Sequence, residues 1–315
     1  FVGGRTAFAM FDAVYLEAAD LADGEGFLPS GKARCEVECL LAFLPFMFVD
    51  LRAPVSERLF ATDASSRSAA IVESRVPALT AREMWRFRYR KGTASTELRT
   101  LAGQFADRMD AGLAEHTARA LLGLAELAAA DAREEGVELD EGAGDPPAWS
   151  AALADALPWK PIWHGPVDVR SHINRKEAVP IGLLARRLAR DPSAQGKRYV
   201  VAVDSSVNVA SWAKGRSRSR ALNSVLRRAC PEQMLGGVRL GYVHVRSAHN
   251  PADDPTRGRP VRSRARFVPY AGSPLGQLLA GTPMSHATLG RVFGVDTSLP
   301  AALFAAGESP RPWSP

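Results

Sequence analysis

The stretch KRYVVAVDSS, residues 197–206, decides which class of fold this sequence can form. Its apolar run has no polar alternation, which is typical of a strand buried on both faces of a sheet. The run ends at Asp204, so a carboxylate follows the strand directly. Strand ends that lead into a turn are the usual place for functional groups in an α/β sheet. We therefore expect a central strand that presents Asp204 at the sheet edge.

The segments on either side of this strand alternate between strand and helix patterns. The expected elements are a hairpin in RLFATDASSRSAAIVESRV (58–76), a strand in WHGPVDVRSHIN (163–174), a helix at 174–189, two helices within 206–229 separated at KGRS (214–217), and a strand in GVRLGYVHVRS (237–247). Ile181, Leu184 and Leu188 should share the buried face of the helix at 174–189, and Pro180 should set its start or an early kink. This order predicts an α/β protein with a mixed five-stranded sheet flanked by helices and a helical insertion between the second and third strands.

Composition divides the chain into four regions. They are a helical segment at 1–55, a sheet domain made of 56–77 and 161–262, a helical insertion at 78–160, and a Pro/Gly-rich tail at 263–315. The chain begins FVGGRTAF without an initiator Met, so we expect a fragment of a longer polypeptide.

Charge and hydropathy limit the partners and the compartment. The chain carries a net charge of +6, and residues 205–270 hold 13 Lys and Arg against 3 Asp and Glu. Such a region suits a polyanion such as nucleic acid, although an ordinary solvated basic face explains it equally well. The longest apolar run, at 40–49, is about half of the roughly 20 residues that span a bilayer. The three cysteines fit a reduced, structural role, which indicates an intracellular protein, cytoplasmic or nuclear and not secreted.

Four carboxylates occupy positions where rigid elements could bring them together. Asp63 and Asp204 follow apolar strand segments, Glu177 falls in the first turn expected for its helix, and SAHNPADDPTRG (247–258) offers Asp253. Taken singly, Asp63 and Asp204 are equally explained as turn or N-cap residues, and Glu177 by the helix dipole. Taken together, they form the oxygen-ligand set that Mg²⁺ or Mn²⁺ prefers. SAHNPADDPTRG itself is expected to be a loop, because Pro251 and Pro255 discourage a helix.

Four sequence blocks resemble, in order and spacing, the ribonuclease H domain of retroelement reverse transcriptases. They are ATDAS (61–65), HINRKEA (172–178), VDSSVNVASWAKGRSRSRALN (203–223) and SAHNPADDPTRG (247–258). LLAFLPFMFVDLRAP (40–54) is similar to the segment that joins the polymerase to this domain, which implies that 1–55 is a remnant of the reverse transcriptase. An upstream polymerase of the same polyprotein is then an expected partner. Three departures from the family pattern are Ser66 to Ser68 after the first aspartate, Pro180, and His249.

The resemblance implies hydrolysis of the RNA strand of an RNA–DNA hybrid with two Mg²⁺ or Mn²⁺ ions about 4 Å apart. Asp63, Glu177, Asp204 and Asp253 would be the catalytic residues and metal ligands. Asp253 is chosen over Asp254 because the family aspartate follows alanine directly.

Basic residues in the same blocks would contact the nucleic acid. Those expected to track its phosphate backbone are Lys214, Arg216, Arg218, Arg220 and Arg257. His249 could assist product release, or it could be a structural or solvated loop residue. Two other hypotheses for the function stay open. The chain could be a catalytically degenerate ribonuclease H-like relic that only binds nucleic acid, or it could be an integrase-like nuclease. No membrane partner is expected.

Overall fold

The central feature of the computed structural model is one five-stranded sheet. The structure describes residues 5–11, 13–19, 29–46, 50, 52–89, 146–217, 219–261 and 274–293. Most of the predicted insertion, at 90–145, and the end of the tail therefore lie outside the described residues. The strands are β1 (Val55–Ala64), β2 (Ser68–Arg75), β3 (Lys160–Pro166), β4 (Arg198–Val203) and β5 (Arg239–His244).

The sheet has the strand order β3-β2-β1-β4-β5. β1, β2 and β3 pair antiparallel, as consecutive strands joined by a tight turn can, whereas β1, β4 and β5 run parallel. The parallel pairs need crossover connections, and helices supply them. This mixed sheet confirms the predicted α/β fold class, and its topology is consistent with a ribonuclease H-like fold.

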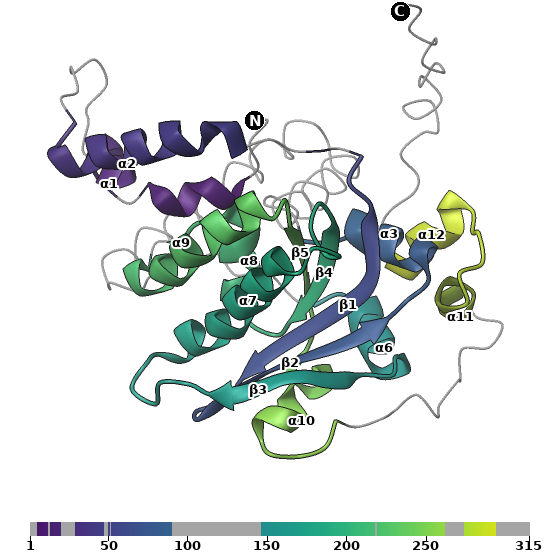
Figure 1. Ribbon diagram of the computed structural model, residues 1–315. Coiled ribbons are helices and arrows are strands. Elements are labelled where there is room, and N and C mark those ends of the chain that lie inside the picture. Colours follow the sequence, from purple (N-terminus) through teal and green to yellow (C-terminus); the bar gives the residue numbers. More distant parts are fainter. Residues whose placement is uncertain are drawn as a thin grey trace, which may run out of the picture.

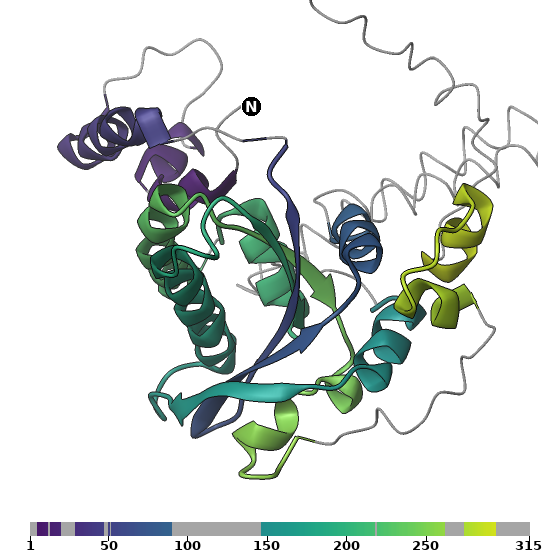
Figure 2. The ribbon, with the colours of Figure 1, turned by 45° about the vertical axis from the view of Figure 1, so that its right-hand side comes forward.

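Helices cover both faces of the sheet (Figures 1 and 2). One face carries α7 (Ile173–Arg190), α8 (Ser206–Lys214) and α9 (Arg220–Leu235), and the other carries α3 (Ala78–Arg86) and α6 (Ala148–Ala156). Successive side chains of β1 point to opposite faces of the sheet. Phe60 packs with α7 on one face, whereas Leu59 and Ala61 pack with α3 and α6 on the other. The apolar strands β1 and β4 are thus buried on both sides, as the sequence of β4 predicts.

The predicted face of α7 is correct, but Pro180 does not set the start of the helix. Ile181, Leu184 and Leu188 are buried, and the helix runs from Ile173 through Pro180 to Arg190 without interruption. Burial of this apolar face against the sheet outweighs the missing amide hydrogen bond. Because the helix begins at Ile173, Glu177 lies in its second turn and not in its first.

The break between α8 and α9 falls at KGRS, as predicted. Gly215 ends α8 with a φ of 76°, a left-handed conformation that glycine adopts without strain. Ser219 then caps α9 by accepting a hydrogen bond from the Leu222 amide.

The segment SAHNPADDPTRG is not the helix-free loop that its prolines predict. It forms the 3₁₀ turn η3 (Ser247–His249) and the one-turn helix α10 (Asp253–Thr256). Pro255 is tolerated because it lies in the first turn of α10, where an amide has no intrahelical acceptor, and Asp253 and Asp254 favour a helix N-terminus.

Both ends of the chain contribute further helices. The N-terminal region contains η1 (Arg5–Met10), α1 (Ala13–Ala19), α2 (Gly31–Phe43) and η2 (Leu44–Phe46), and the region predicted as a tail contains α11 (Pro274–Leu279) and α12 (His286–Phe293). Leu278, Leu289 and Phe293 are buried in the same core as α3 and α6. No helix in the described ranges is long and apolar enough to cross a membrane.

Candidate active site

Asp63 and Asp204 lie side by side at one edge of the sheet. Thr62 of β1 pairs with Val203 of β4 in parallel register, so each aspartate is the next residue on its strand. Neighbouring strands are about 4.8 Å apart, which puts the two carboxylates within strong electrostatic reach of each other. Asp63 is only 5% exposed. The tertiary structure thus joins two residues that are far apart in sequence.

Glu177 reaches this edge from α7 and is held by Asn208 of α8. The Asn208 Nδ2 donates to Glu177 Oε2 at 3.2 Å and to Ser205 Oγ at 3.0 Å, and it also donates to the carbonyl oxygen of Asn174. Asn208 is completely buried. A buried amide with these contacts fixes the side chain of Glu177 next to the turn that carries Asp204.

α10 brings Asp253 to the same place. The hydroxyl oxygen of Thr256 lies 3.2 Å from Asp63 Oδ2 and 2.8 Å from the carbonyl oxygen of Asp253. On the hairpin side, the hydroxyls of Ser65 and Ser68 donate to the carbonyl oxygen of Thr256. Ser65 and Ser68, at the two ends of the β1–β2 turn, therefore connect α10 to β1 and β2.

The ionisation of these carboxylates shows that they interact. Burial, followed by the charges of Asp204, Asp253 and Glu177, raises the pKa of Asp63 to about 7. Burial, with a further contribution from Asp204, raises the pKa of Glu177 to about 7. Burial also raises the pKa of Asp204, and the Ser247 hydroxyl, which donates to its Oδ2 at 3.0 Å, opposes that shift. Desolvation and nearby negative charge both oppose the ionisation of Asp63, Glu177 and Asp204.

The donor set fits a hard divalent cation in its chemistry. The Oδ1 of Asp204 is buried and accepts no hydrogen bond, which is costly unless another positive or donor group contacts it. In the described part of the chain, however, no three Asp, Glu, His or Cys side chains are arranged closely enough to hold an ion as they stand. The carboxylates interact through their charges, and their side chains would have to move for them to share a ligand.

Arg257 pairs with one of these carboxylates. Its Nε and Nη2 both lie 2.8 Å from Asp253 Oδ1, in an i,i+4 pair across the end of α10. The interpretation of Arg257 as a phosphate contact stays a prediction, because this structure places its guanidinium on Asp253.

The KGRSRSR turn is only partly open to a ligand. The guanidinium of Arg216 lies 4.0 Å from the ring centroid of Tyr15 in α1, Lys214 is half-buried, and Arg220 is exposed. Arg218 lies outside the described residues. The N-terminal helices thus cover part of the surface where the sequence predicts backbone contacts.

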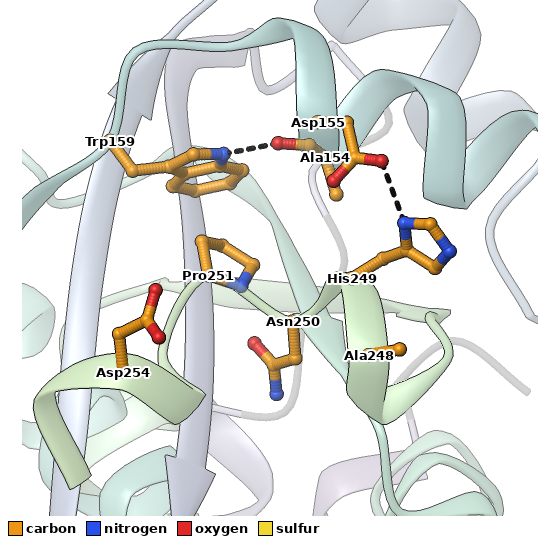
Figure 3. A pocket seen from close by; sticks show the side chains of 8 residues that line it. All are labelled: Ala154, Asp155, Trp159, Ala248, His249, Asn250, Pro251 and Asp254. Atoms are coloured by element: carbon orange, nitrogen blue, oxygen red, sulfur yellow. Dashed lines mark hydrogen bonds and ion pairs between the residues drawn. The ribbon is translucent and has the colours of Figure 1, made fainter. Parts of the chain in front are cut away.

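His249 is attached to α6 (Figure 3). Its Nδ1 lies 2.7 Å from Asp155 Oδ2, beside a cavity of about 20 Å³ that is also lined by Trp159, Asn250 and Pro251. That volume holds about one water molecule, so the cavity does not accommodate a substrate. The contact favours the structural reading of His249 over the auxiliary one.

Sequence reasoning missed the polar residues that hold the carboxylates or the segments next to them. Asn208, Ser247 and Thr256 bond to a carboxylate, whereas Asn250 and Lys176 bond to neighbouring backbone carbonyl groups. All of them lie inside the blocks that carry the acidic residues, and all except Ser247 are buried. Their positions next to the candidate metal ligands could have identified these polar residues, but the sequence does not show that they are buried.

Comparisons with family models, curated proteins and solved structures each gave no match. The fold and the site therefore define the class of this protein: an α/β protein with a mixed five-stranded sheet, helices on both faces, and a group of interacting carboxylates at one edge of the sheet.

Proposed function

We propose that this chain is a ribonuclease H-like endonuclease of a retroelement polyprotein that hydrolyses the RNA strand of RNA–DNA hybrids. The observation that carries this proposal is the gathering of Asp63, Glu177 and Asp204, whose pKa values burial raises, beside α10 and its Asp253, at the edge of a sheet with this topology. These residues match, one by one, the positions that the resemblance assigns to the metal ligands.

In this proposal Asp63 and Asp204 hold Mg²⁺ or Mn²⁺, with Glu177 and Asp253 on either side. Two bound ions would activate the attacking water and stabilise the leaving 3′ oxygen. The chain's own residues orient the ligands: Asn208 holds Glu177, and Ser247 holds one oxygen of Asp204 while the other stays without a hydrogen bond. A hybrid would be recognised by its shape and by its 2′-hydroxyl groups.

Cleavage of a labelled RNA–DNA hybrid by the purified chain in Mg²⁺ tests this proposal. We expect cuts in the RNA strand alone, and no cuts by Asp204→Asn, which keeps the size of the side chain and removes its charge. A folded wild-type chain that leaves the hybrid intact in both Mg²⁺ and Mn²⁺ would refute the enzymatic function.

A second candidate function, nucleic-acid binding without chemistry, is favoured by the ion pair between Arg257 and Asp253. It predicts that EDTA and Asp63→Asn leave hybrid binding unchanged and that no cleavage occurs. Cutting of plain duplex DNA would instead support the integrase-like reading.

A further inference from the structure

Four exposed arginines lie on the loops that surround the carboxylates. They are Arg67 in the β1–β2 turn, Arg170 in the β3–α7 loop, Arg246 after β5, and Arg259 after α10. Among the described residues, none of these four guanidinium groups makes a hydrogen bond, an ion pair or a ring contact. An exposed arginine with no partner in the protein can bind an anion without first breaking an ion pair.

Arg67 and Arg246 lie next to residues that bind the carboxylates. Arg67 sits in the turn between Ser65 and Ser68, whose hydroxyls donate to Thr256, the residue that contacts Asp63. Arg246 directly precedes Ser247, which donates to Asp204. These two positions are therefore fixed relative to the centre of the site.

A buried lysine holds the loop of Arg170 against the turn of Arg67. The Nζ of Lys176, which is 6% exposed, donates to the carbonyl oxygens of Ser66 at 3.0 Å and Val169 at 2.9 Å. The amide of Val167 also donates to the carbonyl oxygen of Arg67 at 3.0 Å. Both loops are thereby joined to each other. Lys176, which bonds to both of them, directly precedes Glu177 in α7.

The backbone of Arg259 is bonded to α10. Its amide donates to the carbonyl oxygen of Asp254 at 2.9 Å, next to Asp253.

The β3–α7 loop that carries Arg170 has one exposed acidic side chain, Asp168. This carboxylate accepts hydrogen bonds within its own turn, from the Arg170 amide and the Ser171 hydroxyl. Cationic positions thus lie on four separate loops next to the elements that carry the carboxylates.

We propose that Arg67, Arg170, Arg246 and Arg259 form a phosphate-binding rim that holds the nucleic-acid backbone next to the carboxylates. This inference rests on the proposed function for the identity of the ligand, a nucleic-acid duplex. It assigns the main contacts with the nucleic-acid phosphates to the rim. The KGRSRSR turn is not assigned this role, because there Arg216 stacks on Tyr15. Guanidinium groups suit this role because they bind phosphate oxygens with paired hydrogen bonds.

The salt dependence of hybrid binding tests the rim. Affinity for a fluorescent RNA–DNA hybrid is measured by anisotropy from 50 to 300 mM KCl, with the full chain carrying Asp204→Asn and with EDTA, so that no cleavage occurs. The rim variant is Arg67→Gln, Arg170→Gln, Arg246→Gln and Arg259→Gln combined. Each lost phosphate contact lowers the slope of log K against log salt by roughly 0.7 to 0.9, so we expect a decrease of about 3 and binding at least about tenfold weaker at 100 mM.

A matched variant controls for net charge. It combines Arg34→Gln, Arg75→Gln, Arg82→Gln and Arg228→Gln, four exposed arginines without a side-chain partner among the described residues and away from the carboxylates. We expect this variant to keep most of the wild-type slope. Equal losses in the two variants would overturn the rim, as would a larger loss from Lys214→Gln, Arg216→Gln and Arg220→Gln combined.

The two proposals fail separately. Cleavage by the wild-type chain together with a rim variant of unchanged salt slope overturns the rim and leaves the nuclease standing. A rim-dependent slope in a chain that never cleaves supports the rim and overturns the nuclease.

Discussion

At the scale of single residues, Asp63 has an unfavourable environment for a charge. Its pKa is raised to about 7 from the usual 3.8, first by burial and then by the neighbouring carboxylates. Between these two pH values the folded chain binds a proton that the unfolded chain has released. The stability that this proton contributes is fully present below about pH 4 and is lost as the pH rises through about 7.

Asp63→Asn should therefore stabilise the chain at high pH when EDTA is present. We expect a gain in the free energy of unfolding on the order of 1–3 kcal/mol at pH 8, from about 1.4 kcal/mol per pKa unit, and a smaller gain at pH 5. Urea unfolding at both pH values measures it. Asp50→Asn is the control, because that exposed carboxylate has a lowered pKa and should give no gain at pH 8. Equal gains at both pH values would contradict this explanation.

Arg257 competes with any cation for Asp253. Its guanidinium contacts Oδ1 twice, so Arg257→Met should release that oxygen and tighten Mn²⁺ binding about threefold to tenfold, the range for a partly exposed ion pair of about 1 kcal/mol. Calorimetric titration without nucleic acid measures this change.

Arg259→Met is the matched control for Arg257. It removes the same charge from a position without an ion pair among the described residues, and it should change Mn²⁺ binding less than Arg257→Met does. Equal changes in Mn²⁺ affinity would mean that long-range charge causes both changes. The contact between Arg257 and Asp253 would then not contribute.

At the scale of elements, α10 depends on the β1–β2 turn for its position. A four-residue helix is too short to be stable alone, since helix formation begins with a costly first turn. Hydrogen bonds from Ser65 and Ser68 to Thr256 supply the missing support. Ser68, one of the residues that depart from the pattern of the resemblance, thus has a structural role in positioning α10.

Ser68→Ala should loosen α10 selectively. We expect a loss of about 1 kcal/mol in the free energy of unfolding, because the buried Thr256 carbonyl oxygen loses a hydrogen-bond donor. Faster hydrogen exchange at the amides of Gly258 and Arg259, which bond to α10 carbonyl groups, is the direct measurement. Ser66→Ala, at an exposed position of the same turn, should leave both quantities unchanged. Unchanged exchange in Ser68→Ala would show that the turn does not support α10.

At the scale of the whole molecule, the sheet separates two cores. Phe60, Tyr199 and Leu184 belong to the layer of α7 and α9, whereas Met84, Trp149 and Leu278 belong to the layer of α3, α6 and α11. The carboxylates lie at the edge where strands, α7 and α10 meet. Charge repulsion at that edge therefore opposes the stability that the two cores provide.

A bound divalent cation should relieve this repulsion and stabilise the whole fold. We expect 10 mM Mg²⁺ to raise the melting temperature by about 2–6 °C over EDTA, since a ligand at 100 times its dissociation constant adds about 2.7 kcal/mol. Differential scanning calorimetry at matched ionic strength, with K⁺ as the control, measures the shift. An equal rise in Asp204→Asn would contradict specific binding at the carboxylates.

Most strands and helices of the sheet domain were predictable, because each has a local pattern. Val200 to Val203 indicate a doubly buried strand, and Ile181, Leu184 and Leu188 mark the buried face of α7. Two local rules failed where tertiary packing outweighed them: α7 continues through Pro180, and α10 forms despite Pro255. The acidic residues were identified by motif, but Thr256, Asn208 and Lys176 were not, because their roles depend on partners far away in sequence.

The sequence alone determined the α/β class and the order of strands and helices, because the spacing of apolar residues sets which elements can bury a face. The tertiary structure alone decided the register of Asp63 beside Asp204, the attachment of α10 to the β1–β2 turn, and the placement of Arg257 on Asp253. These features are long-range or depend on burial. A carboxylate's ionisation is set by the charges and the solvent around it, and neither is known until the chain has folded.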